Sequence, residues 1–175
     1  MRLTDDLIEE HKLIKKLIGF LSDKAKLIEE GSKADKDFFE KAVYIIKNFA
    51  DKFHHAKEED ILFVEMVKKG MPEKDSPIEA MLIEHEQGRE FVSGMALALE
   101  RLDKDAGQAI IQNARGYIEL LNEHIDKEDN ILYPLAERMF TQAEKQKMLK
   151  EFKRAERGKL PFKEYQAMIG SLERR

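Results

Sequence analysis

Two segments of the chain place a histidine four residues before a glutamate, which is about one turn of an α-helix. These segments are His54-His55-Ala56-Lys57-Glu58 and His124-Ile125-Asp126-Lys127-Glu128. Two further histidines, His11 and His85, stand alone on other segments that have helical periodicity. Imidazole nitrogens and carboxylate oxygens are common ligands of transition-metal ions. The sequence therefore predicts a metal site whose ligands come from four helices.

Four long amphipathic helices are expected to position these residues. The first begins after Thr4, a candidate N-cap, and ends before Gly31, and the second runs from near Asp35 to Gly70. The third begins at the capping box Ser76-Pro77-Ile78-Glu79 and ends at about residues 103–105. The fourth runs from there to about Phe140. No segment alternates with a period of two, so strands are not expected. Short connections make the helices antiparallel neighbours, and the predicted fold class is an all-α, up-and-down four-helix bundle.

Titratable residues interrupt the apolar stripes that such a bundle buries. The stripe of the second helix reads Ile46, Ala50, His54, Glu58 and Ile61, and that of the fourth reads Tyr117, Leu121, His124, Glu128, Ile131 and Leu135. A buried carboxylate without a partner costs several kcal/mol, so that glutamates in these stripes favour a bound cation. The predicted metal ligands are His11, His54, Glu58, His85, His124 and Glu128.

Rotation along a helix separates the inner carboxylates from the outer ones. Residues four apart on an α-helix differ by about 40° and residues five apart by about 140°. Glu58 and Glu128 therefore share a face with their histidines. Glu59 and Asp129 are expected outside the ligand set, as outer partners or in solvent. His55 has polar neighbours one turn away, and we expect it at the edge of the bundle or behind the ligands.

Four imidazoles and two carboxylates exceed the needs of a single ion. Zinc is satisfied by four ligands, whereas a mixture of imidazole and carboxylate suits iron or manganese. A carboxylate can also bridge two ions. A pair of ions with two bridging glutamates and two histidines each would keep open coordination positions. Open positions imply binding or redox chemistry with a small ligand.

The composition limits the class of protein. The chain has 175 residues, of which 42% are hydrophobic, and this suits one domain with its own core. It has no cysteine, which excludes disulfides, zinc–thiolate sites and iron–sulfur clusters. No signal-peptide pattern and no apolar run of about 18 residues occurs, so we expect a cytoplasmic protein without membrane insertion. A net charge of −4 argues against nucleic-acid binding.

Residues 141–175 differ from the rest in charge. The capping box Thr141-Gln142-Ala143-Glu144 predicts a further helix, which Gly158 and Pro161 interrupt. Ten Lys/Arg and four Asp/Glu fall in residues 145–175. This basic segment could bind an acidic protein partner or membrane surface. Its apolar residues favour the other interpretation, a helical extension docked on the acidic bundle at residues 1–140.

Residues 3–140 resemble the hemerythrin-like, or HHE cation-binding, family. The resemblance is carried by Phe53-His54-His55-Ala56-Lys57-Glu58-Glu59-Asp60-Ile61-Leu62-Phe63, by Glu84-His85-Glu86, by His124 to Pro134 with its second His-x-x-x-Glu, and by Leu7 to His11. It implies a centre of two non-heme iron ions held by the six predicted ligands, with manganese or zinc as alternative metals.

The third helix departs from the pattern of oxygen-carrying members, which have a His-x-x-x-His pair there. Met81 and Arg89 flank His85 at the spacing of four, so the second histidine is missing. The resemblance therefore implies sensing, chemistry with peroxide or nitric oxide, or iron handling, more than simple oxygen carriage. The expected small ligand is O2, peroxide or NO. Two alternatives stay open: an oxidase or peroxidase, and a helical interaction module with a structural metal.

Overall fold

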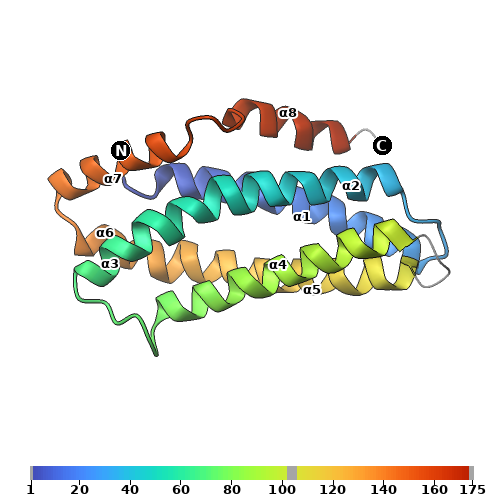
Figure 1. The fold of residues 1–175 in the computed structure, drawn as a ribbon, viewed down its shortest axis with the longest axis horizontal. Coiled ribbons are helices and arrows are strands. Elements are labelled where there is room, and N and C mark those ends of the chain that lie inside the picture. Colours follow the sequence, from blue (N-terminus) through green and yellow to red (C-terminus); the bar gives the residue numbers. More distant parts are fainter. Residues whose placement is uncertain (1, 102–105, 174–175) are drawn as a thin grey trace.

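The computed structural model describes residues 2–101 and 106–173, and these form helices, turns and loops with no strand. Four long helical rods run up and down beside one another (Figure 1). The first rod is α1 (Asp5–Glu29) and the third is α4 (Pro77–Arg101). The second rod starts as α2 (Lys36–Ile45) and continues through η1 (Ile46–His55) and η2 (Glu58–Leu62) to α3 (Phe63–Lys68). The fourth rod starts as α5 (Ala106–Lys127) and continues through η3 (Glu128–Leu132) to α6 (Tyr133–Met139). The predicted all-α bundle is confirmed.

The helix boundaries agree with the predicted start and stop signals, but the caps differ in detail. Thr4 precedes α1 without capping it, because its hydroxyl lies 3.3 Å from Glu137 Oε1. At α4, Ser76 Oγ accepts a hydrogen bond from Glu79 N, whereas Glu79 accepts from Asp75 N. The predicted end of the third helix at residues 103–105 lies outside the described residues. The helix that contains Pro134 continues to Met139.

Three stretches of π-helix, named η1, η2 and η3, interrupt the second and fourth rods. The i→i+5 hydrogen bond of a π-helix widens the turn and changes which residues face inward. Ile131 was expected on the apolar stripe but is 58% exposed, whereas Leu132 is buried. Ile61 is likewise only partly buried, and Leu62 takes its place in the core. The predicted stripes after Glu58 and Glu128 are therefore wrong by one residue.

The core consists of two apolar clusters with a titratable layer between them. One cluster contains Ile14 and Leu121, and the other contains Leu7 and Leu132. His11 falls between Leu7 and Ile14 on α1, at the boundary of the two clusters. The residues in the polar layer are nearly inaccessible to solvent, and they are His11, His54, His55, Glu58, His85, His124 and Glu128.

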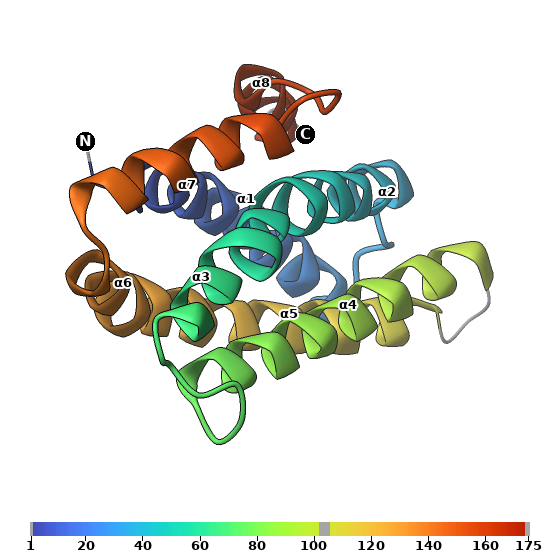
Figure 2. The same cartoon turned by 60° about the vertical axis from the view of Figure 1, so that its left-hand side comes forward.

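Two further helices, α7 (Gln142–Ala155) and α8 (Phe162–Leu172), lie along α1 and α2, on the side away from α4 and α5 (Figure 2). Thr141 and Glu144 make both bonds of the predicted capping box. Gly158, at φ +78°, separates the two helices. Phe152 and Ile169 are fully buried, so this extension shares apolar contacts with the bundle. Within the described residues, no helix is long and apolar enough to cross a membrane.

Candidate metal centre

The polar layer brings seven side chains together in two adjoining groups. In each group the candidate ligand atoms all lie within 4.8 Å of one another. The first group is His11, His54, Glu58 and Glu128, and the second is His55, His85 and His124. All six residues that the sequence predicts as ligands are in these groups. His55 is an additional member.

The two glutamates of the first group lie at its border with the second, because each is close to one imidazole of either group. The distances from histidine Nε2 to glutamate Oε2 are 3.5 Å for His54–Glu58, 3.7 Å for His85–Glu58, 3.2 Å for His11–Glu128 and 3.2 Å for His124–Glu128. The imidazoles of His85 and His124 also approach within 3.0 Å through their Nε2 atoms. Glu58 and Glu128 are thus placed to be shared by two metal positions.

The surroundings of the glutamate oxygens show whether a cation fits this polar layer. Among the described residues, Glu58 Oε2 and both carboxylate oxygens of Glu128 are buried and have no hydrogen-bond partner. Buried polar atoms are nearly always satisfied, and a carboxylate left without a partner is costly. These oxygens face imidazole nitrogens that are themselves metal ligands by type. The residues present therefore fit a metal ion with mixed imidazole and carboxylate ligation.

Each of four histidines is held by a carboxylate at its other ring nitrogen. The pairs join Nδ1 of His11 to Asp129 at 2.7 Å, of His54 to Glu10 at 2.9 Å, of His85 to Glu59 at 2.6 Å and of His124 to Glu84 at 2.9 Å. A hydrogen bond from Nδ1–H to a carboxylate fixes the ring and leaves Nε2 as the ligand atom. Every one of these Nε2 atoms lies in the polar layer.

Outer cations balance three of these carboxylates closely. Lys57, which is fully buried, contacts Glu10 and lies 3.2 Å from Glu156, the residue that follows α7. Arg89 Nη2 lies 2.6 Å from Glu59 Oε1. The corresponding partner of Glu84 is Lys127, and Lys15 stands 3.8 Å from Asp129. The imidazole layer is therefore enclosed by a carboxylate layer and then by a cationic one.

The structure corrects the expectation that His55 lies at the edge of the bundle or behind the ligands. It is 6% exposed, and its ring stacks on His85 with 3.8 Å between the ring centroids. The expectation used the angular step of an α-helix, whereas His55 lies in the π-helical segment η1. A wider turn has a smaller angle between successive residues, so His54 and its neighbour both face inward. Arg89, which lies four residues after His85 where the second histidine is missing, contacts Asp51 and Glu59.

Tyr133, Glu10 and Glu84 belong to the site, although sequence reasoning did not assign them to it. Tyr133 Oη donates to Glu58 Oε1 at 2.5 Å and lies 3.2 Å from His11 Nε2. The sequence signal for Tyr133 is its place after the second His-x-x-x-Glu. Glu10 and Glu84 have no local signal, because each holds a histidine on another helix.

The pKa values of Glu58 and Glu128 are shifted in opposite directions. Burial, and then the neighbouring Glu128 carboxylate, raise the pKa of Glu58 well above its usual range. Burial acts the same way on Glu128, but His124 and His11 outweigh it and hold the pKa of that carboxyl well below its usual range. Two adjacent buried carboxylates are thus costly to keep charged together, and a bound cation would relieve that cost.

The chain belongs to the hemerythrin HHE cation binding domain family, whose sequence model matches residues 2–136. This match covers the first three rods, the fourth rod up to residue 136, and all seven residues of the polar layer. It confirms the resemblance to the family and agrees with a cation-binding role for the buried histidine and glutamate cluster.

The chain is also similar to uncharacterized proteins of mycobacteria. One is from Mycobacterium bovis and two are from strains of Mycobacterium tuberculosis, each 21% identical over 169 residues. The alignments cover 94% of this chain and 65% of each relative, so the chain spans slightly less than two thirds of their length. No solved structure matches the chain.

Proposed function

We propose that this protein holds two non-heme iron ions and binds a small oxidant or gas, namely dioxygen, peroxide or nitric oxide. One observation carries the proposal: two buried glutamates lie between a group with two imidazoles and a group with three. A mixed set of imidazole and carboxylate ligands with open positions is typical of non-heme iron that meets oxygen. Manganese and zinc are the alternative metals.

The unequal groups assign different roles to the two positions. His55, His85 and His124 with the shared glutamates offer five protein ligands to one ion. His11 and His54 with the same glutamates offer four to the other. Iron held there would supply redox chemistry and a place for a small ligand. Tyr133 lies beside this second position, since its hydroxyl is 3.2 Å from His11 Nε2.

Metal analysis and optical spectroscopy test the proposal. Protein purified without oxygen should contain about two iron ions per chain, and its absorption should change on adding air, azide or nitric oxide. A structural metal would give no such spectral response. Protein that is fully folded, metal-free and unable to take up iron would refute the proposal.

A matched pair of variants links the spectrum to the glutamates. Glu58→Gln removes one shared carboxylate from the buried layer, so it should lower the iron content and abolish the response to azide. Glu86→Gln changes an exposed glutamate of α4 that pairs with Arg89. This control should keep both properties. Equal iron content and equal spectra in the two variants would contradict the assignment of Glu58.

A further inference from the structure

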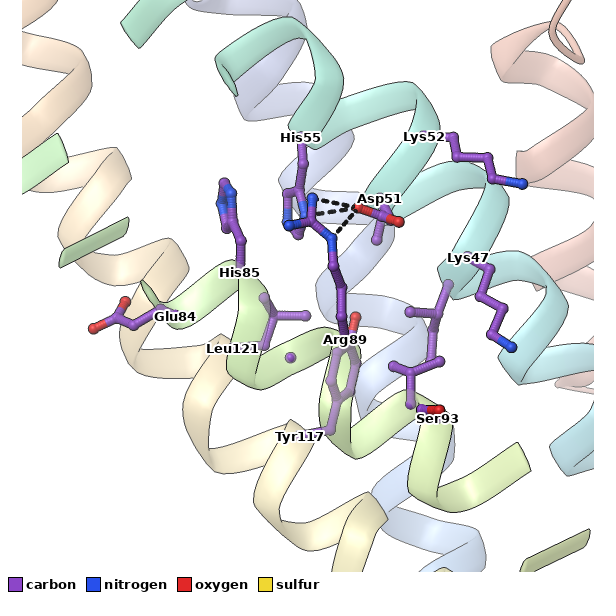
Figure 3. A pocket seen from close by; sticks show the side chains of 14 residues that line it. Lys47, Asp51, Lys52, His55, Glu84, His85, Arg89, Ser93, Tyr117 and Leu121 are labelled. Carbon is purple, nitrogen blue, oxygen red and sulfur yellow. Dashed lines mark hydrogen bonds and ion pairs between the residues drawn. The ribbon is translucent and has the colours of Figure 1, made fainter. Parts of the chain in front are cut away.

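A cavity of about 270 Å³ lies beside the metal centre, lined from η1, α4 and α5 (Figure 3). Apolar residues form one part of its wall and charged or polar residues another, and His55 and His85 contribute to the wall as well. The apolar residues are Ile46, Ala50, Val92 and Leu121. An apolar cavity of roughly 150 Å³ is enough for benzene. This one has room for a single substituted ring.

Two buried polar atoms in the cavity wall have no hydrogen-bond partner among the described residues, and they are Nδ1 of His55 and the hydroxyl of Tyr117. Tyr117 extends from α5 and lines the cavity, and it is 2% exposed (Figure 3). Within the described part of the chain, its hydroxyl makes no hydrogen bond. Burial raises the pKa of Tyr117, so that the hydroxyl stays protonated and able to donate. A buried hydroxyl without a partner is unfavourable, and a ligand with one oxygen atom would satisfy it.

Lys47 and Lys52 line the cavity but are exposed to solvent, whereas the less exposed charged groups are balanced by one another. Arg89 Nη2 lies 2.7 Å from Asp51 Oδ1, and the same guanidinium contacts Glu59 and Glu86. A charged ligand entering the apolar part would lose its hydration and gain no free counter-charge there. The cavity therefore favours an uncharged ligand.

From these observations we propose that the cavity is a second binding site, which takes an uncharged single-ring organic molecule with one hydrogen-bonding oxygen, such as a phenol. The ring would pack against Val92 and Leu121, and the oxygen would accept a hydrogen bond from Tyr117. The cavity is built from protein atoms alone, so this proposal does not depend on which metal the centre holds. A ligand there would lie next to His55 and His85.

Calorimetric titration of the purified protein with phenol, toluene and benzoate tests the chemistry of this site. Phenol should bind saturably, in roughly the millimolar range. Toluene, which lacks the oxygen, should bind roughly two- to tenfold more weakly, as expected for one hydrogen bond. Benzoate should bind more weakly than phenol. Absence of saturable phenol binding, or tighter binding of benzoate, would overturn the proposal.

Two tyrosine variants and one crystal test the location. Tyr117→Phe keeps the ring but removes the hydroxyl, so phenol and toluene should then bind equally well. Tyr165→Phe is the control, because its hydroxyl lies 3.3 Å from the carbonyl of Asn48, which does not line the cavity. This variant should keep the preference for phenol. In a crystal with 4-bromophenol, anomalous scattering should place bromine between α4 and α5. A bromine peak elsewhere, or an unchanged preference in Tyr117→Phe, would refute the site.

Discussion

The hydroxyl of Tyr133 sits where the apolar core meets the ligand layer. It donates to Glu58 Oε1, and its ring stacks on His11 with centroids 5.3 Å apart. Burial and the nearby carboxylates raise the pKa of Tyr133 well above its usual value, so the group stays a donor at neutral pH. It therefore orients one oxygen of Glu58 and leaves the other toward the centre.

Tyr133→Phe should weaken metal binding without unfolding the protein. Loss of an outer hydrogen bond to a ligand typically costs about 10- to 100-fold in metal affinity. Competition with a chelator of known affinity measures the change, and Tyr165→Phe serves as the control for loss of a buried tyrosine hydroxyl. Equal metal affinity in the two variants would contradict a positioning role for Tyr133.

Lys57 is a second residue beside the site whose contacts the sequence pattern did not predict. Its ammonium is fully buried, contacts Glu10 and Glu156, and lies 4.3 Å from the centroid of the Phe53 ring. Burial raises the pKa of Glu10 to about 7 even though Lys57 opposes this shift. The ion pair thus limits the rise in the pKa of Glu10, the partner of His54, so that this carboxyl is partly charged near neutral pH.

Lys57→Met should lower the free energy of unfolding by about 1–3 kcal/mol, because the buried Glu10 carboxyl loses its partner and takes up a proton. Urea denaturation followed by circular dichroism gives the value. The double variant Glu10→Gln/Lys57→Met should recover part of the loss, since the amide carries no charge. A single variant as stable as the parent chain would show that the pair contributes nothing.

At the scale of elements, the π-helical segments determine the site. They coincide with the ligand residues on the second and fourth rods: η1 ends at His55, η2 begins at Glu58 and η3 begins at Glu128. An additional residue per turn brings two adjacent histidines of η1 to the interior and turns Leu62 and Leu132 into the core. Ordinary α-helices with the same sequence would point His55 toward the rim.

The cap of α7 gives a prediction for pH dependence. Glu144 lies 2.6 Å from Lys69 Nζ and accepts hydrogen bonds from the backbone and hydroxyl of Thr141. These interactions lower the pKa of Glu144 from its ordinary 4.5 to about 2. A lowered folded-state pKa contributes stability above about pH 4.5, and the contribution is lost as the pH falls toward 2.

Glu144→Gln should therefore lower the melting temperature at pH 7, and the difference from the parent chain should shrink as the pH falls from 4.5 toward 2. Thermal unfolding at pH 7 and at pH 3 measures both differences. Glu151→Gln, on the exposed side of the same helix, should have a smaller effect at pH 7. A difference for Glu144→Gln that grows on acidification would have the wrong sign.

At the scale of the whole molecule, the extension is connected to the metal centre. A chain of contacts runs from Glu156, at the end of α7, through Lys57 and Glu10 to His54. The ring of Tyr165, on α8, lies 4.8 Å from that of Phe49 between centroids. The described part of the extension thus helps to close the bundle on its α1 and α2 side. Binding of a protein partner through its basic residues stays a prediction.

A chain that ends at Phe140 should lose cooperative folding. It would lack five buried apolar side chains, Met148, Phe152, Tyr165, Ile169 and Leu172. At about 1.5–3 kcal/mol each, their burial is comparable to the total stability of a typical domain. The truncated chain should show a broad urea transition and reduced iron content. A sharp transition at the parent midpoint with full iron loading would contradict this expectation.

The sequence alone determines much of this protein. Helical periodicity locates the four rods, and the His-x-x-x-Glu spacing indicates four candidate ligands, because residues four apart share a face in an α-helix and nearly share one in a wider turn. The other two, His11 and His85, are lone histidines on apolar stripes. A glutamate in an apolar stripe is costly in any arrangement of the helices. The six residues could therefore be proposed as ligands before their neighbours were known.

Only the tertiary structure decides the other parts of the site. The π-helical turns bring His55 inward. Helix propensity does not predict these turns, because they depend on how the buried histidines and glutamates pack. Glu10 and Glu84 follow no local pattern, since each serves a histidine on another helix. The cavity beside His85 likewise arises where side chains of three elements leave a space. Spacing along one helix is a local property, whereas the partners of a buried group are set by packing between helices.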